Sequence, residues 1–441
     1  MSVVTRIPPS PTGRLHIGTA RTALFNYLFA KKHGGTVVFR SEDTDRARSQ
    51  KEFEKEITDG LSWLGVSWDS FSRQSEHTAR YTELLKKIIE SDHAYISKEP
   101  AKDDPSREVE VVRLRNPGTD VIFEDAIRGP INTHTGDLGD FVIARSPTDA
   151  LYHFAVVVDD MDAGVTHVIR GEDHISNTAR QILIQEALGA PRPIYAHLPL
   201  ILASDRSKMS KRHGAVSLSE YQAEGFLPEA VVNYLALLGW NPGDEREDFS
   251  LVELVQEFDL ARVHKAGAVF DMVKFKSVNQ RWMRKLSDEE YLARGALAAS
   301  ENARLAKAVS LLKERAQTFG EARALLETEL SCLFSTPTLD SAVLTEKAST
   351  QAEGFTKKAL EGFASLIEDL KSLEFPEEIK TELMPYAEDA EAARKGGRGA
   401  SLWPLRYALS GLPKSPDPFT LIYILGRDEA LSRIRAALVI L

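Results

Sequence analysis

The sequence predicts an α/β domain built on a doubly wound parallel sheet, followed by an all-helical second half. Two short β-rich runs with a helical stripe between them open the chain, and a similar alternation returns after residue 150. After about residue 220 the apolar side chains recur at helical spacing instead. Strands that alternate with helices favour a parallel sheet with helices on both faces.

The first βαβ unit occupies the start of the chain. Residues 3–7 form a β-rich run, and residues 36–40 form a second one directly after Gly34 and Gly35. Strands joined through a helix are normally parallel with a right-handed crossover, so we expect these two to pair in parallel. The helix between them is predicted from an apolar stripe: Ala20, Ala23, Leu24, Tyr27 and Leu28.

A second α/β unit follows an insert. Residues 165–170 predict a strand, residues 171–174 its exit loop, and residues 197–202 a further strand after a helix. Between the two units, residues 94–150 are rich in charge, proline and glycine, with short β-rich runs such as 109–114. We interpret this stretch as a subdomain inserted into the doubly wound fold.

The second half of the chain shows two apolar stripes at helical spacing. They consist of Leu305, Ala308, Val309 and Leu312, and of Leu360, Phe363, Ile367 and Leu370. The resulting division is 1–93 and 151–219 for the two halves of the α/β domain, 94–150 for the insert, and 220–292 and 293–441 for two helical domains.

Composition narrows the class of protein. Of 441 residues, 43 % are hydrophobic and 27 % charged, which is ordinary for a globular chain. The single cysteine, Cys332, excludes an internal disulfide and a cysteine-rich zinc site, and its apolar neighbours predict a core position. Neither a signal peptide nor an apolar run of roughly 20 residues is present, so we expect a cytoplasmic protein with no membrane segment. The net charge of −10 argues against nonspecific nucleic-acid binding, whereas a specific complex needs only a local basic face.

A proline- and glycine-rich loop, residues 9–19, joins the first predicted strand to the first predicted helix. Ligands of open α/β sheets bind at the carboxyl ends of the strands, and a helix N-terminus there attracts phosphate. Gly18 would let a nucleotide approach the backbone, and His16 could donate a hydrogen bond to a phosphate oxygen. The alternative is a tight turn with an exposed histidine, which the surrounding βαβ pattern disfavours.

A basic loop follows the strand predicted at residues 197–202. Lys208 and Lys211 lie three residues apart, with Arg212 beside them. Lysines that reach a leaving pyrophosphate only as its charge accumulates stabilise the transition state selectively. A solvated basic loop is the alternative. The pairing of this loop with the His16 loop, across two α/β halves, favours an ATP site.

The two loops resemble the two signature sequences of class I aminoacyl-tRNA synthetases, and within that class the bacterial glutamyl enzymes. The resemblance is strong over residues 3 to about 285 and weaker beyond, at Gly411 and residues 425–426. It implies a Rossmann-like catalytic domain with an inserted acceptor-stem-binding subdomain, then helical stem-contact and anticodon-binding domains. The further stretches that carry it are residues 6–13, 40–45, 158–160, 168–174, 225–230 and 233–235.

The resemblance implies a pocket for L-glutamate. Arg6 and Arg170 resemble the carboxylate-binding arginines of the family, and a guanidinium binds a planar carboxylate through two parallel hydrogen bonds. Tyr152 would add a hydroxyl to the same group, while Ser10 and Glu42 resemble the partners of the α-ammonium. A surface salt bridge is the alternative for either arginine. Their positions at the carboxyl ends of predicted strands disfavour it.

The resemblance also implies residues for ATP and tRNA. The catalytic residues would be His16, Lys208 and Lys211. The ATP-binding residues would be Pro9, Thr12, His16, Gly18, Thr19, Asp173, Ile201, Leu202, Lys208, Met209, Ser210 and Lys211. The tRNA-binding residues would be Asp45, Arg48, Lys274, Lys276, Arg281 and Arg284.

The last four of these belong to the densest basic segment of the chain, in which Phe270, Phe275 and Trp282 are interleaved. Basic and aromatic side chains suit the phosphates and splayed bases of RNA. A solvated helix face with core aromatics is the alternative. The anticodon would bind in the later helical blocks, which carry Arg394, Lys395, Arg398 and Arg406.

Two departures from the family pattern bear on cofactors. The final histidine of the first signature is Thr19 here, which is common among glutamyl enzymes. Some relatives hold zinc in the insert, but this insert has no cysteine and His134 as its one imidazole, so we expect no zinc. Magnesium is expected on the ATP phosphates.

The reaction implied by the resemblance is ATP-dependent activation of L-glutamate to glutamyl adenylate, followed by transfer to the 3′ end of tRNA(Glu). Activation is expected to wait for tRNA, the acyl group to go to the 2′-hydroxyl, and the enzyme to be a monomer. Whether the enzyme charges tRNA(Gln) as well, or instead, stays open.

Four other kinds of protein are alternatives to this interpretation. A non-catalytic tRNA-binding paralogue should have lost His16, the lysines or the pocket arginines, and none is missing. A glutaminyl-tRNA synthetase builds its anticodon half from β-barrels, whereas this half is predicted to be helical. A small-molecule nucleotidylyltransferase would not need the long helical chain after the lysine loop. The truncated paralogue of the family that glutamylates a modified nucleoside lacks that helical half as well.

Overall fold

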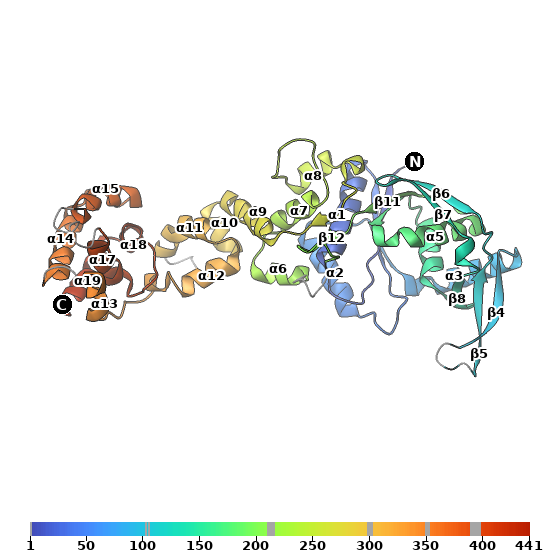
Figure 1. Ribbon diagram of the computed structural model, residues 1–441, viewed down its shortest axis with the longest axis horizontal. Helices are drawn as coiled ribbons and strands as arrows, with labels where there is room; N and C mark the ends of the chain where they lie inside the picture. Colours follow the sequence, from blue (N-terminus) through green and yellow to red (C-terminus); the bar gives the residue numbers. More distant parts are fainter. Residues whose placement is uncertain are drawn as a thin grey trace. The chain divides into compact units, whose positions relative to one another are not determined.

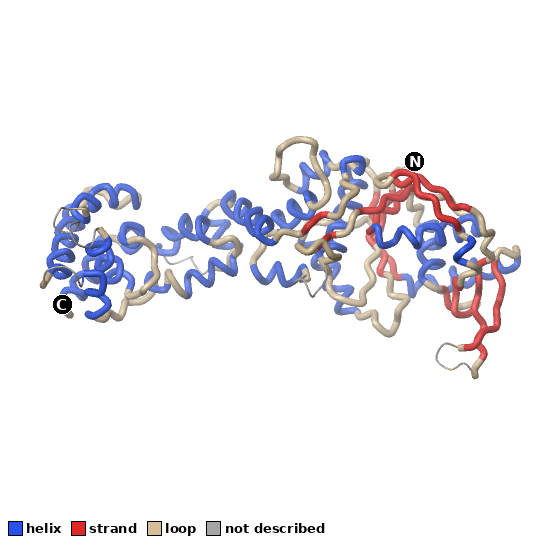
Figure 2. Tube along the Cα trace, viewed as in Figure 1, coloured by secondary structure: helices blue, strands red, loops and turns tan. Residues whose placement is uncertain are grey.

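The structure, a computed structural model, describes residues 2–101, 104, 106–209, 217–297, 303–348, 353–388 and 398–441. The chain forms two compact units, Met1–Val278 and Asn279–Leu441. In the described residues the strands belong to the first unit, and the second unit is helical (Figures 1 and 2). The division falls inside the predicted segment 220–292, and the five-segment division stays a prediction.

The strands of the first unit are β1 (Val4–Ile7), β2 (Thr36–Ser41), β3 (Ser70–Arg73), β4 (Ala94–Pro100), β5 (Glu108–Leu114), β6 (Asp120–Asp125), β7 (Gly129–His134), β8 (Val142–Ser146), β9 (Asp149–Ala150), β10 (His167–Gly171), β11 (Ile194–Leu198), β12 (Ile201–Leu202) and β13 (Ala268–Val269). Its helices are α1 (Ile17–Lys32), α2 (Lys51–Trp63), α3 (Thr78–Glu90), α4 (Tyr152–Asp162), α5 (Ile175–Leu188), α6 (Leu218–Glu224), α7 (Pro228–Leu237) and α8 (Leu251–Glu257). Helix α9 (Met272–Lys285) runs across the division between the units.

The central sheet is parallel and doubly wound. β1 pairs in parallel with β2, β2 with β3, and β10 with β11. The edges of β1 and β10 meet where the Thr166 backbone N–H donates to the Val4 carbonyl at 3.0 Å. The strand order is therefore β3-β2-β1-β10-β11, and it reverses between β1 and β10. This reversal confirms the predicted fold class and marks the switch point at which such sheets bind ligands.

Helices cover both faces of this sheet. α3, α4 and α5 bury their apolar sides in one core together with Val168 and Tyr195 of the sheet. On the other face α1 packs against α7 and α8, with the rings of Phe25 and Phe258 4.9 Å apart. The sequence predicted one buried stripe on α1. Helix α1 buries Ala20, Leu24, Asn26 and other residues on most of its sides, because α7 and α8 cover its outer surface.

The insert contributes to two sheets. β4, β5, β8 and β9 form an antiparallel sheet of their own. β6 and β7 form a hairpin that joins the edge of the central sheet, where Asp125 pairs with Tyr195 of β11. The insert is therefore bonded directly to β11, the strand beside β10.

The strand predicted at residues 197–202 is wrong in its extent. β11 ends at Leu198, and β12 is a separate short strand that pairs with β13. Pro199 lies between them and has no N–H to donate, so it cannot continue the ladder.

The second unit buries the residues that the apolar stripes predicted. Leu305, Ala308 and Leu312 are buried on α11, Phe363 is buried on α14, and Cys332 is 2 % exposed. In the part of the chain that the structure describes, no helix is long and apolar enough to cross a lipid bilayer. The helices of this unit are α10 (Asp288–Arg294), α11 (Ala303–Arg315), α12 (Phe319–Glu327), α13 (Ser341–Thr345), α14 (Phe355–Asp369), α15 (Pro376–Ala387), α17 (Gly399–Ser410), α18 (Pro418–Leu425) and α19 (Arg427–Val439).

Candidate active site

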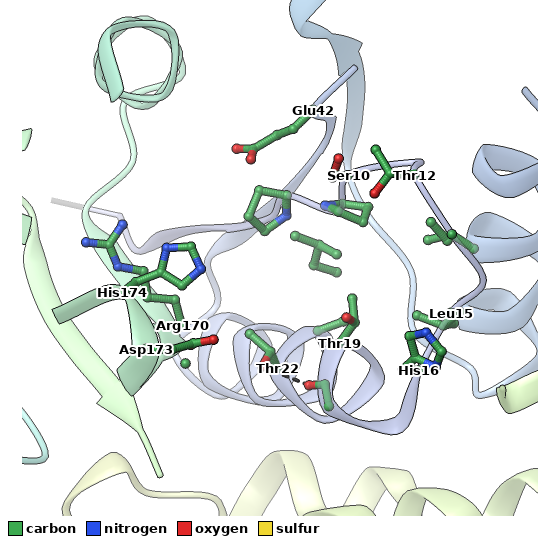
Figure 3. Close-up of a pocket in the computed structure, with 18 of the residues that line it drawn as sticks. Ser10, Thr12, Leu15, His16, Thr19, Thr22, Glu42, Arg170, Asp173 and His174 are labelled. Carbon is green, nitrogen blue, oxygen red and sulfur yellow. Dashed lines mark hydrogen bonds between the residues drawn. The ribbon is translucent and has the colours of Figure 1, made fainter. Parts of the chain in front are cut away.

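A cleft of about 1020 Å³ opens at the switch point, where the carboxyl ends of β1 and β10 meet (Figure 3). The loops after β1, β2 and β10 and the first turn of α1 form its walls. Most of the residues predicted for glutamate and ATP line it, together with two of those predicted for tRNA. These residues are Pro9, Ser10, Thr12, His16, Gly18, Thr19, Glu42, Asp45, Arg48, Tyr152, Arg170, Asp173, Ile201, Lys208 and Met209.

Other predicted residues lie elsewhere. Arg6 and Leu202 are not among the residues that line the cleft, and Arg6 is buried with an exposure of 2 %. Ser210 and Lys211 lie outside the described residues, as do Arg212, Arg394 and Lys395. The four basic residues predicted from the densest basic segment lie on α9: Lys274, Lys276, Arg281 and Arg284.

The first turn of α1 faces the cleft. His16 precedes the helix with extended backbone angles (φ −97°, ψ 157°), and no acidic side chain lies in the first turn. The first N–H groups of a helix have no partner within it and favour an anion. A Cβ built on Gly18 would meet nothing within 4 Å, so this glycine leaves open space at the helix start. The arrangement suits a phosphate chain.

Lys208 at the start of the lysine loop and Ser217 after it form backbone contacts at the cleft. Lys208 forms a backbone bridge with Leu202, and Ser217 forms one with His16. The Lys208 ammonium donates to Asp173 Oδ2 at 2.8 Å, directly after β10. Partial burial raises the pKa of Asp173, but the Lys208 hydrogen bond and charge outweigh that effect and hold this pKa below its ordinary value. The two predicted loops therefore meet at the same cleft.

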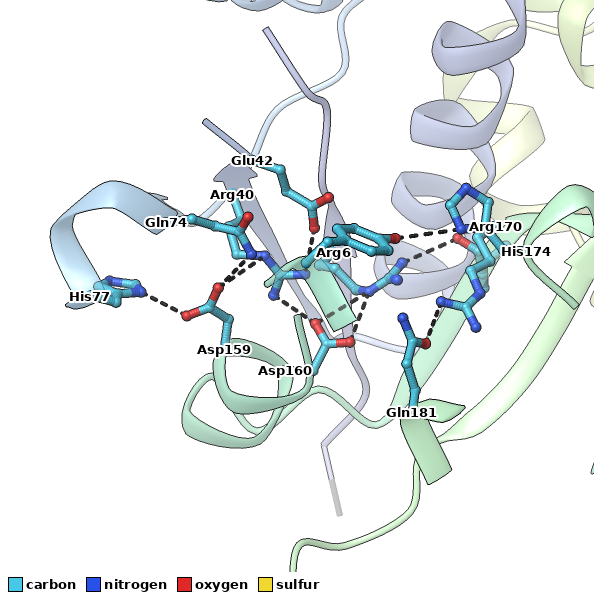
Figure 4. A network of polar contacts seen from close by, with 12 residues as sticks. Arg6, Arg40, Glu42, Gln74, His77, Asp159, Asp160, Arg170, His174 and Gln181 are labelled. Carbon is cyan, nitrogen blue, oxygen red and sulfur yellow. Dashed lines mark hydrogen bonds and ion pairs between the residues drawn. The ribbon is translucent and has the colours of Figure 1, made fainter. Parts of the chain in front are cut away.

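A buried ionic cluster lies beside the cleft, centred on Asp160 of α4 (Figure 4). The Arg40 guanidinium donates to Asp160 Oδ1 at 2.6 Å and to Glu42 Oε1 at 3.0 Å. Arg6 Nε lies 3.4 Å from Asp160 Oδ1, and Arg6 also donates to the Ile169 carbonyl. Burial raises the pKa of Glu42, and the charge of Arg40 opposes this shift only in part. Glu42 is thus paired with Arg40, yet burial still makes its carboxyl harder to ionise than an exposed one.

Asp159, the neighbour of Asp160, anchors the cluster from the other side. It accepts hydrogen bonds from Gln74 at 2.9 Å, from His77 at 2.8 Å and from the Tyr81 hydroxyl at 2.8 Å. Residues 158–160 and 40–45 carry part of the family resemblance, but no role was predicted for Arg40 or Asp160. Two features of the sequence could have indicated this cluster. Arg40 and Glu42 are charged residues at the end of a strand, and Asp159 and Asp160 are successive carboxylates directly after the apolar residues 154–158.

Arg170 differs from the other buried arginines of the cluster. Its guanidinium donates to three neutral groups: Gln181 Oε1 at 2.7 Å, Thr178 Oγ1 at 2.7 Å and His197 Nε2 at 3.2 Å. Among the described residues it forms no ion pair, although it is 5 % exposed. Burial lowers its pKa, and the positive charge of Arg6 lowers it further. A buried cation with neutral partners is well suited to bind an anion.

Neutral side chains complete this end of the cleft. The Tyr152 hydroxyl lies 3.4 Å from His174 Nδ1. Burial raises the pKa of Tyr152 to about 12, with the carboxylate of Glu42 adding to the effect. Burial and the charge of Arg170 lower the pKa of His174 to about 4. Both rings are therefore neutral near pH 7. His174, Thr178, Gln181 and His197 were not predicted as site residues, although His174 ends the quoted stretch 168–174.

The basic residues of helix α9 form ion pairs and hydrogen bonds within the protein. Lys274 pairs with Glu247 at 2.9 Å and Lys276 with Glu224 at 3.3 Å. Arg284 donates to the Lys313 and Glu314 carbonyls at the end of α11, and so bonds to that helix. Two of the three interleaved aromatics belong to the core, as the alternative to RNA contact proposed: Phe270 and Phe275 pack with Tyr221, Phe226 and Tyr234.

The second unit carries a basic and aromatic hollow of about 450 Å³. Trp403 lies at its centre, with the Arg406 guanidinium 4.7 Å and the Lys347 ammonium 5.7 Å from its ring centroid. The Trp403 indole donates to the Val343 carbonyl at 2.9 Å, which fixes the ring. Among the described residues, no group of three or more His, Cys, Asp or Glu side chains could hold a metal ion.

Comparison with known proteins covers nearly the whole chain. The family model described as tRNA synthetases class I (E and Q), catalytic domain, matches residues 2–104 and 97–277, and the anticodon binding domain model matches residues 272–438. The glutamate–tRNA ligase of Aquifex aeolicus is 41 % identical over 98 % of this chain and 98 % of its own. That of Anaeromyxobacter is 40 % identical with the same coverage.

A solved structure agrees with these relatives. The glutamate tRNA ligase from Elizabethkingia meningosepticum, crystallised in complex with its amino acid, matches with a TM-score of 0.85 at 30 % identity, over 99 % of each chain. The matches span both the unit that holds the cleft and the helical unit. The chain belongs to the glutamate–tRNA ligase family of class I aminoacyl-tRNA synthetases.

Proposed function

We propose that this chain activates L-glutamate with ATP in the switch-point cleft and transfers it to the 3′ end of tRNA(Glu). Family membership carries the activity of a glutamate–tRNA ligase. The observation that supports the residue-level proposal is Arg170, a buried guanidinium at the cleft whose hydrogen bonds go to neutral groups. A substrate carboxylate would supply the missing counter-charge.

In this proposal the two ends of glutamate have different partners. Arg170 binds a carboxylate, the buried Arg6 adds its positive charge nearby without lining the cleft, and Tyr152 donates its hydroxyl to the same carboxylate. Glu42 and Ser10 accept the α-ammonium. The raised pKa of Glu42 supports this role. Burial disfavours the charged carboxylate, and the positive charge of a bound ammonium would stabilise it.

ATP would occupy the other end of the cleft. Its phosphates would bind the first turn of α1, with His16, Gly18 and Thr19 at the contact and Pro9 and Thr12 on the preceding loop. Lys208, Met209, Ser210 and Lys211 would reach the leaving pyrophosphate, and Asp173, Ile201 and Leu202 would hold the nucleoside. The exposed pair of Lys208 with Asp173 supports this, because such a pair exchanges partners at a cost of about 1 kcal/mol or less.

The chemistry has two steps. An oxygen of the glutamate α-carboxylate bonds to the ATP α-phosphorus while the bond to pyrophosphate breaks. The 2′-hydroxyl of the terminal ribose then attacks the carbonyl carbon of the adenylate, and AMP leaves. Positioning and charge stabilisation by His16 and the lysines supply the catalysis. Magnesium would enter on the ATP phosphates, since it usually binds through substrate phosphates and water.

For tRNA, the exposed pair of Lys274 with Glu247 would open to bind a backbone phosphate at little cost, and the half-buried Lys276 would lie beside it on α9. Asp45 and Arg48 lie at the cleft and would contact the acceptor end, and Arg281 and Arg284 complete the predicted set. The Trp403 hollow would take an anticodon base, because aromatic and guanidinium planes stack on splayed RNA bases.

Aminoacylation with labelled glutamate tests this function. Purified tRNA(Glu) and tRNA(Gln) are offered separately, each with and without ATP. We expect ATP-dependent charging of tRNA(Glu). Charging of both tRNAs, or of tRNA(Gln) alone, would keep the chemistry and change the specificity. If folded protein charges neither tRNA, the proposal is refuted, and the alternative of a non-catalytic tRNA-binding paralogue is favoured instead.

A further inference from the structure

Arg170 is the last member of a buried chain of hydrogen bonds that begins in the insert. Asp125, the last residue of β6, lies 2.6 Å from His197 Nδ1, and His197 Nε2 accepts the Arg170 Nε–H at 3.2 Å. Asp125 is 1 % exposed and His197 is 0 % exposed. The carboxylate is further held by the backbone N–H groups of Ile127 and Arg128 at 3.0 and 2.8 Å.

These contacts define the state of the imidazole. A carboxylate can only accept hydrogen bonds, so His197 carries its proton on Nδ1 and presents the lone pair of Nε2 to Arg170. Burial lowers the pKa of His197, which keeps the ring neutral. Burial raises the pKa of Asp125, but the hydrogen bonds from His197 and the backbone bring it below its ordinary value. Each group thus has the charge that the chain of contacts requires.

The turn that follows Asp125 in the insert also bonds to the residue directly after β10. Arg128 forms an ion pair with Glu172, which follows β10 immediately, and Glu172 Oε1 accepts the Leu200 backbone N–H at 2.8 Å. The insert therefore bonds to both β10 and β11 where these strands end at the cleft. Neither Asp125 nor His197 is among the residues that line the cleft, so neither touches a substrate there.

We infer that Asp125 and His197 are positioning residues, which fix the guanidinium of Arg170 so that its remaining N–H groups point at the substrate carboxylate. The inference rests on the proposed function of Arg170. It makes glutamate binding depend on the insert, because the last residue of β6 supplies the carboxylate that orients His197. Hydrogen-bonded partners of this kind set the tautomer and direction of the group that meets the ligand.

Substitutions at the two positions have a specific expected effect. Asp125→Asn can donate to Nδ1, which would place the proton on Nε2 and leave two donors facing each other at Arg170. His197→Gln cannot span the distance from Asp125 to Arg170 with both contacts. Misdirecting one charged hydrogen-bond donor should raise the KM for glutamate by about ten- to a hundredfold and leave the KM for ATP within about twofold.

The experiment measures both KM values in tRNA(Glu) aminoacylation for the wild type, Asp125→Asn, His197→Gln and Arg170→Gln. The matched control is His167→Gln, which changes a half-buried histidine on β10 that contacts Phe29 and Thr166 rather than Arg170. Thermal unfolding of each variant is recorded in parallel. The double variant Arg170→Gln/His197→Gln tests coupling, since residues that act through one another are not additive.

A raised KM for glutamate alone in Asp125→Asn and His197→Gln, with no further rise in the double variant over Arg170→Gln, supports the inference. Unchanged KM values in these two variants beside a raised one in Arg170→Gln would overturn it and leave the proposed function intact. So would parallel losses for glutamate and ATP that follow the unfolding temperature, because these indicate a purely structural role. An unchanged KM in Arg170→Gln itself would refute the assignment of Arg170 and the inference together.

Discussion

The Asp160 carboxylate lies 2.6 Å from the Arg40 guanidinium, and both side chains are buried beside the cleft. Arg6 shares the same carboxylate. One acidic side chain therefore holds two cations that water does not reach. Removing one partner of a buried pair leaves an uncompensated charge, which is far more costly than the loss of an exposed pair.

We predict that Asp160→Asn destabilises the first unit by about 3–5 kcal/mol, because Arg6 and Arg40 lose their common counter-charge. Denaturant unfolding followed by circular dichroism measures the change. Asp162→Asn is the matched control on α4, since its pair with Arg80 is partly exposed and should contribute about 1 kcal/mol or less. Equal destabilisation by the two variants would contradict the role given to Asp160.

Gly18→Ala separates binding from stability at the start of α1. The added methyl group meets no protein atom within 4 Å, and alanine favours a helix, so the free energy of unfolding should stay equal or rise by up to about 1 kcal/mol. The same methyl group would lie where the nucleotide approaches, and should raise the KM for ATP about tenfold or more. Steady-state aminoacylation at varied ATP measures it. A normal KM for ATP would place the nucleotide elsewhere.

Lys208→Ala should lower the kcat of aminoacylation by about 10²–10³-fold, because a cation at the leaving pyrophosphate is lost. Its pair with Asp173 is exposed, so the unfolding temperature should hardly change. Lys55→Ala, which removes an equally exposed pair with Asp59 on α2, is the control and should keep full activity. Full activity of Lys208→Ala would show that this lysine does not take part in catalysis.

Stability should fall as the pH decreases from about 6.5 towards 4. Burial, together with nearby arginines, lowers the pKa of His153 and of His174 to about 4, whereas an unfolded histidine titrates near 6.5. Between about pH 6.5 and 4 the unfolded chain binds more protons than the folded one, so the free energy of unfolding decreases as the pH falls. His153→Gln should weaken the pH dependence of the melting temperature between pH 7 and 5. Equal slopes for the wild type and His153→Gln would contradict the assignment.

The sequence predicted β1, β2, β10, β11 and the loop at residues 9–19 because these depend on local patterns, whereas β3 of the same sheet was not predicted. The run at residues 3–7, the stripe on α1 and the loop at 9–19 each carry their signal within a few residues. The split between β11 and β12 was missed, although Pro199 stands in the middle of the predicted strand. The strand was predicted from its apolar residues alone, although Pro199 has no N–H to donate to a neighbouring strand.

The polar network behind the site was not predicted, because its partners come from distant parts of the chain. Arg40 meets Asp160 from 120 residues away, and Asp125 meets His197 from 72 residues away. Their pairing depends on the strand order and on how the insert returns to the sheet edge. Neither follows from local spacing. Arg170 could be named from its motif, but its neutral partners could not.

The most direct test of the account is exchange of labelled pyrophosphate into ATP, with tRNA(Glu) present and glutamate varied, for the wild type and Arg170→Gln. We expect the wild type to catalyse exchange only when glutamate is added, and Arg170→Gln to need at least about tenfold more glutamate at an unchanged KM for ATP. Glutamate-independent exchange, or the same glutamate dependence in both proteins, would contradict the central claim that Arg170 binds the substrate carboxylate in the switch-point cleft.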